Sequence, residues 1–276
     1  MKQTQHRHLA IIFIVLAFAG ISCSGWLRSP SRDHYKQAHD QWEKKEYAHA
    51  LYLGSKAVVS DPAQWRPKRF LNDHFDKGMQ QIKQYLEQTQ NPSEVAVADK
   101  RHQTYSYLVD MYANIEKMKL PLKHKDKFSG ETEIVDYSDE KEAARKEAIN
   151  VHYENSERLL GEKSRDGVKN AAGLYNKAIK QYATSEEKNE LETRAFDRLK
   201  KHGDEFGSSG KIGEAASAYD AYAFALHFKA SDEVKKAQDK VAVHVSELWV
   251  AKGKAHEAKK DLDNMLAASQ SYKNAI

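Results

Sequence analysis

Cysteine is almost absent from this chain. Its 276 residues contain one cysteine, Cys23. A single thiol cannot form an intrachain disulfide, and it cannot supply the several thiolates of a cysteine-based zinc site. Side-chain packing must therefore stabilise the fold, and a chain of this length can bury a sizeable core.

Proline is scarce and unevenly placed. All five prolines lie at or before Pro121, and residues 122–276 contain none. Proline interrupts helices because it removes a backbone donor, so a long proline-free stretch favours helix. Frequent Ala, Lys and Glu add to this preference. The sequence predicts an all-α fold.

A strong net charge of one sign is also missing. The chain has 44 basic and 40 acidic residues, which gives a formal charge of +4. Lys2 and Arg7 are the only charged residues in the segment 1–22, so the remainder carries 42 − 40 = +2. Such a balance creates no broad field for nucleic acid. We expect no nucleic-acid partner.

Catalytic and metal-binding motifs are lacking as well. The sequence contains no G-x-S-x-G, P-loop, G-x-G-x-x-G or H-E-x-x-H pattern. Thirteen histidines are scattered, and His34 and His39 are five residues apart. A helical ligand pair needs a spacing of three or four. We therefore expect no enzyme activity, no metal and no cofactor, with histidines in surface or packing roles.

The N-terminus has the composition of an export signal. Two basic residues precede the uncharged apolar run from Leu9 to Ile21, which is about 20 Å long as a helix and short for a bilayer core of about 30 Å. Ala19, Gly20, Ile21 and Ser22 then lead into the single Cys23. This pattern resembles the lipobox of bacterial lipoproteins, although Gly20 stands where leucine is common.

The lipobox resemblance implies a lipid on the Cys23 sulfur and removal of residues 1–22. Attached acyl chains would anchor the protein to a membrane. Ser24 follows the cysteine where an aspartate would favour the inner membrane. The resemblance therefore implies an outer-membrane lipoprotein facing the periplasm. The alternative is an ordinary cleaved signal with a chance cysteine.

Helical-hairpin repeats are visible downstream. The clearest stretch shows Gly203, Phe206, Gly210, Ala215, Tyr219 and Tyr222. These residues and spacings resemble the tetratricopeptide repeat, a hairpin of about 34 residues. In that family, small residues such as Gly203 and Ala215 let the helices approach, and Phe206 and Tyr219 fill the space between hairpins. Gly210 provides backbone freedom at the turn. Tyr222 is large where the family has a small residue.

Three further stretches fit the same template in part. The residues at the template positions are Ser246, Trp249, Gly253, Ala255, Ala258, Leu262 and Met265; Leu159, Val168, Ala171, Tyr175 and Ala178; and Tyr47, Ala50, Gly54, Ala57 and Pro62. Leu159 and Met265 are larger than the family expects, and Gly54 replaces the usual aromatic residue. Ala171, Ala215 and Ala258 are 44 and 43 residues apart, which exceeds the repeat length. The resemblance implies a tetratricopeptide-like α-solenoid with unusual spacing, and a non-repetitive helical bundle is the alternative.

The chain divides into five predicted segments. They are a signal peptide (1–22), the lipidated cysteine with a short linker (23–32), N-terminal hairpins (33–121), an irregular loop or insert (122–142) and a C-terminal array (143–276). Within 33–121, apolar periodicity predicts a helix from Phe70 to Thr89 and another through Tyr105 to Ile115, with Ser93 as a candidate N-cap. Within 122–142, a short strand at Ile134, Val135 and Tyr137 is the one regular element we consider.

A repeat array of this kind offers a concave surface for binding proteins. In the repeat register, the residues expected to face that surface are Tyr35, His39, Trp42, Tyr153, Ser156, Lys200, Asp204, Val243, Glu247 and Val250. Trp42 is either a binding anchor or a packing residue. The sequence favours a membrane-anchored, non-catalytic scaffold or assembly factor for unidentified envelope proteins. The alternatives are a ligand-binding lipoprotein with 122–142 as a lid, and a cell-wall enzyme or activator on a helical platform.

Overall fold

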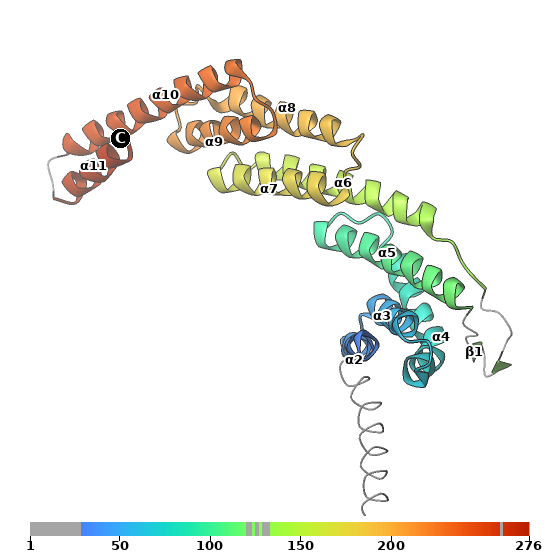
Figure 1. Cartoon of the computed structure of the whole chain (residues 1–276). Coiled ribbons are helices and arrows are strands. Elements are labelled where there is room, and N and C mark those ends of the chain that lie inside the picture. Colours follow the sequence, from blue (N-terminus) through green and yellow to red (C-terminus); the bar gives the residue numbers. More distant parts are fainter. Residues whose placement is uncertain (1–28, 120–122, 125–126, 129–132, 260–261, 276) are drawn as a thin grey trace, which may run out of the picture. The chain divides into compact units, whose positions relative to one another are not determined.

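The protein is all-α in the residues described by the computed structural model, namely 29–119, 123–124, 127–128, 133–259 and 262–275 (Figure 1). The helices are α2 (Pro30–Glu43), α3 (Tyr47–Ser60), α4 (Trp65–Gln88), α5 (Val95–Met118), α6 (Ser138–Leu160), α7 (Arg165–Tyr182), α8 (Lys188–Phe206), α9 (Ile212–Phe228), α10 (Asp232–Glu257) and α11 (Leu262–Ala275). The predicted signal peptide, Cys23 and most of the linker lie outside these residues.

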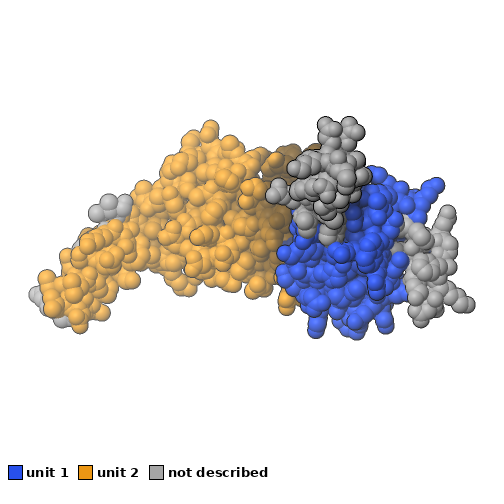
Figure 2. Space-filling view, turned by 60° about the horizontal axis from the view of Figure 1, so that its bottom comes forward, with its two compact units in different colours: residues 1–91, 99–144 blue, residues 92–98, 145–276 orange. Residues whose placement is uncertain are grey.

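The chain forms two compact units, coloured separately in Figure 2. Residues 1–91 and 99–144 make the first unit. Residues 92–98 and 145–276 make the second. The short stretch 92–98 thus belongs with the later part of the chain: Ala98 is buried in the core of the second unit, and the carbonyl of Ser93 accepts a hydrogen bond from Asn155 at 2.9 Å.

The first unit begins with an antiparallel hairpin of α2 and α3. Pro30 occupies the first position of α2, where its missing amide costs nothing, and the Ser29 side chain caps the helix by accepting from the Arg32 amide. The Ser31 hydroxyl at the start of α2 donates to the Ala57 carbonyl near the end of α3 at 2.8 Å. The hairpin predicted from the sequence is present, and α2 begins three residues before the predicted start at 33.

Helices α4 and α5 complete the first unit. The apolar stripe predicted for α4 is buried, and its residues are Leu71, Phe75, Met79, Ile82 and Leu86. The rings of Phe75 and Tyr112 meet edge to face, with centroids 6.2 Å apart, where α4 packs on α5. Ser93 lies two residues before the first residue of α5, so its predicted capping role is wrong.

The segment 122–142 differs from the prediction in two places. Its regular structure is a two-residue antiparallel pair, β1 (Lys123–His124) with β2 (Lys127–Phe128), while Ile134 and Val135 are exposed and irregular. Helix α6 begins at Ser138, so residues 138–142 are helical where a loop or insert was predicted. The Asp136 side chain accepts from the Ser138 amide at 2.9 Å, which satisfies a donor at the start of α6.

The second unit contains most of α6 and all of α7 to α11. The sequence template locates its core correctly at Val168, Ala171, Tyr175 and Ala178, each with no exposed surface. The interval from Gly161 to Ser164 turns the chain from α6 into α7, and Ser164 caps α7 by accepting from the Gly167 amide.

The hairpin of α8 and α9 explains the unusual Tyr222. A Cβ added to Gly203 would lie 2.5 Å from the Tyr222 ring, so this ring occupies the space that a side chain at 203 would need. The Tyr222 hydroxyl donates to the Asp204 carboxylate at 2.7 Å. The missing side chain and the large residue therefore compensate for each other across the two helices.

Two other expectations for this hairpin are wrong. Tyr219 is 37% exposed at the edge of the buried face of α9, so it does not fill an internal space. Gly210 does not use the left-handed backbone region that glycine alone adopts freely. Other residue types would therefore meet no backbone strain there.

The last hairpin turns later than the template predicts. Gly253 lies inside α10 and is buried, and the helix continues to Glu257 with Ala258 at its cap. Ala251, Lys252, Lys254 and Ala255 around this glycine all favour helix, which outweighs the cost of one glycine. Leu262 and Met265 consequently belong to α11, where both are exposed.

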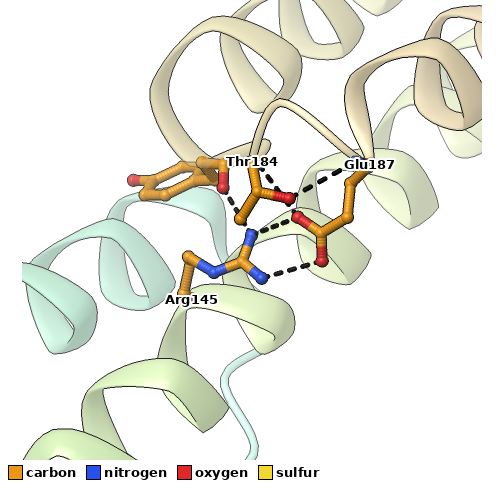
Figure 3. A network of polar contacts seen from close by, with 4 residues as sticks. Arg145, Thr184 and Glu187 are labelled. Atoms are coloured by element: carbon orange, nitrogen blue, oxygen red, sulfur yellow. Dashed lines mark hydrogen bonds and ion pairs between the residues drawn. The ribbon is translucent and has the colours of Figure 1, made fainter.

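An ion pair fastens the turn between α7 and α8 to the start of α6 (Figure 3). The Arg145 guanidinium donates to both carboxylate oxygens of Glu187, at 2.7 and 2.8 Å, and also to the Tyr182 carbonyl. Glu187 accepts from the Thr184 amide at 3.0 Å, while the Thr184 hydroxyl accepts from the Glu187 amide at 3.3 Å. These bonds hold the pKa of Glu187 at about 2, well below its ordinary value.

Candidate functional site

The predicted contact residues on α2 form an aromatic cluster with α4. The Trp42 ring packs edge to face against His74 and Tyr47, with centroid distances of 4.3 and 4.9 Å. His39 lies 4.7 Å from the Phe70 ring, and Tyr35 lies 4.8 Å from His39. All three predicted residues are half-buried. Trp42 therefore has the packing role that the sequence analysis named as its alternative.

The same cluster brings two histidines together. Burial lowers the pKa of His39, and His74, 6.3 Å away between ring centroids, lowers it further. The Nδ1 atom of His74 is within 2.9 Å of the Phe70 carbonyl oxygen. The lowered pKa favours the neutral form of the His39 ring, which suits the apolar packing of this cluster.

Tyr153 and Ser156 were predicted to face a binding surface, and this prediction is wrong. Both side chains are completely buried in the second unit. The Tyr153 hydroxyl donates to the Leu191 carbonyl at 2.7 Å, and burial raises its pKa strongly. The Ser156 hydroxyl lies between the carbonyls of His152 and Ala171. These two residues join α6 to α7 and α8.

Lys200 and Asp204 bind each other on the surface of α8. The Lys200 ammonium lies 2.8 Å from the Asp204 carboxylate and 3.4 Å from that of Glu233. These neighbours raise the pKa of Lys200, with Asp204 contributing most. Asp204 also accepts from Tyr222, so its carboxylate has a structural role in the hairpin.

The predicted residues on α10 are at least partly accessible, and two of the three are apolar. Val243 and Glu247 are exposed and Val250 is half-buried, at a spacing that places them along one side of the helix. Removing an exposed branched apolar side chain from water lowers the free energy. Val243 is therefore a plausible contact residue, in the position given by the repeat register.

Sequence reasoning missed Trp65, the most exposed of the described tryptophans. It is the first residue of α4, and 59% of its surface is exposed. The guanidinium groups of Arg66 and Arg69 lie 5.7 and 6.0 Å from the indole centroid. A signal was available in the stretch WRPKR, which has a tryptophan with cations one and four residues later. It was overlooked because it falls outside the repeat template.

Sequence reasoning also missed an apolar surface on α11. Leu262, Met265 and Leu266 are each more than half exposed. The template had assigned the first two to helix packing. Their spacing of three and four residues places them on one face.

A cleft of about 250 Å³ lies in the first unit, between the turn from α2 to α3, the end of α4 and the start of α5. In the cleft lining, the Lys100 ammonium donates a hydrogen bond to the Glu46 carboxylate at 2.8 Å. Lys45 also lines the cleft, and the uncharged polar lining consists of three glutamines, two tyrosines and Thr104. None of the described residues of segment 122–142 lines this cleft, so it gives no support to a lid role for that segment.

Comparison with protein-family models, with curated proteins and with solved structures finds no match to this chain. In the described ranges, no three His, Cys, Asp or Glu side chains are placed to hold a metal ion together. No helix in the same ranges has the length and apolar character needed to cross a bilayer. Residues 9–21 and Cys23 are outside those ranges.

Proposed function

We propose that this protein is a lipid-anchored envelope protein whose tetratricopeptide-like helical hairpins serve as a non-catalytic scaffold for another protein. The observation that carries the proposal is the exposed Trp65 with Arg66 and Arg69 beside it. Tryptophan and arginine are the residues that most often dominate the binding energy of protein interfaces.

The position of Trp65 supports binding over packing. Its indole lies mostly in water at the start of α4, whereas Trp42 packs against the rings of Tyr47, Phe70 and His74 in the first unit. The two guanidinium groups lie 5.7 and 6.0 Å from the indole centroid, so the ring and the cations form one combined surface. A complementary partner would offer an apolar pocket for the ring and carboxylates for the arginines.

Trp65→Ala should abolish partner binding while leaving the fold intact. Because the ring is exposed, we expect the free energy of unfolding to change by less than about 0.5 kcal/mol. Trp42→Ala is the matched control and should cost about 2 kcal/mol through lost packing. A photoreactive residue in place of Trp65, compared with one at exposed Asp76 on the same helix, would identify the contacted protein in intact cells. Equal labelling from both positions would contradict a specific contact at Trp65.

The lipid anchor has a separate test. Six residues, 24–29, separate Cys23 from the first residue of α2, and they can span at most about 22 Å. A lipid on Cys23 would therefore keep the first hairpin close to the bilayer. Cys23→Ser should yield a protein that fractionates with soluble proteins and lacks incorporated fatty acid. Retention of labelled fatty acid by this variant would refute attachment at Cys23.

A further inference from the structure

The cleft of the first unit carries hydrogen-bonding groups that the fold leaves unused. Gln81, Gln84 and Gln88 of α4 line it together. Their spacing of three and four residues places them on one face of the helix. None of these three amides bonds to another described residue. Each carboxamide has two N–H donors and one oxygen acceptor, so this wall of the cleft can both donate and accept hydrogen bonds.

A buried hydroxyl beside this wall also has no partner. The Tyr85 side chain lines the cleft, and its hydroxyl oxygen is buried without a hydrogen bond to any described residue. Buried polar groups in folded proteins nearly always have a partner. The Lys100 ammonium lies 5.6 Å from the centroid of the Tyr85 ring, and the Glu46 carboxylate accepts its hydrogen bond. The cleft therefore contains a polar group whose hydrogen bond the described residues do not provide.

Size and charge restrict what the cleft can hold. Its volume of about 250 Å³ is below the range of sites for drug-sized ligands, so a ligand must be compact. Among the lining residues only Ala48 and Ile82 have aliphatic apolar side chains, so an apolar ligand would bury the amides unpaired. Two lysines, Lys45 and Lys100, and one glutamate, Glu46, give the lining a net charge of +1. A ligand with one negative charge neutralises it.

We propose that the cleft binds a single acidic sugar, a ring that carries several hydroxyls and one carboxylate. The hydroxyls of a sugar both donate and accept hydrogen bonds, as the glutamine amides do. The carbon-bound hydrogens of the ring form an apolar face that can pack on the tyrosines of the lining. The carboxylate pairs with Lys45, which forms no ion pair with a described residue.

Two other classes of ligand fit the cleft less well. A peptide segment needs a longer groove than a compact cleft of this volume. A phosphate monoester carries a charge of about −1.5 to −2 at neutral pH, which exceeds the net positive charge of the lining. The acidic sugar matches the cleft in size, in charge and in its mixture of donors and acceptors.

This site is separate from the protein-binding surface proposed above. Trp65 does not line the cleft, although both belong to the first unit. Trp65→Ala should therefore leave sugar binding unchanged. Failure of one proposal can be told from failure of the other, because each has its own variant and its own readout.

Saturation-transfer difference NMR of the purified full chain tests the proposal with three probes. Glucuronate has both the hydroxyls and the carboxylate, glucose lacks the carboxylate, and acetate lacks the hydroxyls. We expect glucuronate to bind with a Kd of about 1 mM, as suits a ligand of this size. Glucose should bind about three-fold more weakly, because an exposed charge pair contributes little. Acetate should give no saturable signal.

Gln84→Leu and Lys45→Met separate the two kinds of contact. Gln84 is exposed, so its substitution removes one amide and leaves the helix intact. We expect it to weaken the binding of glucuronate and of glucose by about five-fold. Lys45→Met should lower the affinity for glucuronate to that for glucose and leave glucose binding unchanged. Gln103→Leu, exposed on α5 and outside the cleft, is the matched control and should bind as the original chain does.

Three results would overturn the proposal. The first is the absence of saturable glucuronate binding up to about 20 mM, well above the expected Kd. The second is acetate binding as tight as that of glucuronate, which would indicate attraction to charge without recognition of the ring. The third is the same glucuronate affinity in Gln84→Leu and Gln103→Leu, which would place the sugar elsewhere on the chain. Circular dichroism of each variant checks that the helices are intact.

Discussion

Gly203→Leu is expected to lower the free energy of unfolding of the second unit by about 3 kcal/mol or more. The space beyond the Gly203 Cα is already filled by the Tyr222 ring, at 2.5 Å from where a Cβ would stand. A leucine must therefore push the ring out of its site. That displacement exposes a buried aromatic residue and breaks its hydrogen bond to Asp204. Urea unfolding followed by circular dichroism measures the loss.

Gly213→Leu on α9 is the matched control. No atom lies within 4 Å of a Cβ built at Gly213, and leucine favours helix more than glycine does. We expect this variant to be as stable as the original chain or slightly more so. Equal destabilisation by both substitutions would mean that leucine disturbs α8 and α9 for a reason other than the ring.

A double variant isolates the contact. Tyr222→Ala alone should cost about 3 kcal/mol because it leaves a cavity. In Gly203→Leu with Tyr222→Ala, the leucine can enter the vacated space, so the two losses should not add. We expect the double variant to be more stable than the sum predicts by at least about 1 kcal/mol. Simple additivity would contradict the direct packing of residue 203 on residue 222.

Arg145→Met is expected to lower stability by about 2 kcal/mol at neutral pH and to change how stability depends on acid. Arg145 is largely buried and serves two acceptors, the Glu187 carboxylate and the Tyr182 carbonyl. Hydrogen bonds to a charged group contribute about 1.5–3 kcal/mol, and methionine replaces only the apolar part of the side chain. Chemical unfolding at a series of pH values measures both effects.

The sign of the pH dependence follows from Glu187. In the unfolded chain its carboxyl group has its ordinary pKa of 4.5, and in the folded protein that pKa is about 2. The ion pair therefore contributes fully above about pH 4.5, and its contribution is lost as the pH falls toward 2. Arg145→Met should flatten this part of the stability profile. A profile with the same slope in both proteins would show that other carboxylates determine it.

Lys235→Met provides a comparison for Arg145→Met. Lys235 pairs with Asp239 at 3.1 Å, but both side chains are well exposed, and exposed pairs contribute about 0.5 kcal/mol or less. We expect no measurable change in acid sensitivity from this substitution. The contrast between the two variants separates the buried pair from a general effect of removing a positive charge.

Helix and core were predictable here because periodicity reports which residues share a face. Val168, Ala171, Tyr175 and Ala178 were correctly assigned to a buried face. Periodicity does not show which neighbouring helix covers that face. The prediction of binding residues required this knowledge, because only uncovered side chains can contact a partner. Tyr153 carried the expected spacing for a surface position, yet Tyr175 of α7 packs against its ring and the Leu191 carbonyl of α8 accepts from its hydroxyl.

The tryptophans illustrate the same limit. Both Trp42 and Trp65 are aromatic residues on amphipathic helices, and the repeat template singled out Trp42. Trp42 faces a neighbouring helix and packs, whereas Trp65 lies at the start of α4, where the described residues leave 59% of its surface exposed. The end of α10 could not be located either, because a glycine within a helix and a glycine in a turn are identical in sequence.

The two units are not consecutive along the sequence, which limits how the second unit can be separated from the first. Residues 92–98 lie between two parts of the first unit in sequence, and they supply Ala98 to the core of the second. A contiguous piece of the chain that contains the whole second unit must therefore also contain residues 99–144 of the first. A fragment that starts at residue 145 would lack the Ser93 carbonyl that accepts from Asn155, and it would have a hole where Ala98 packs.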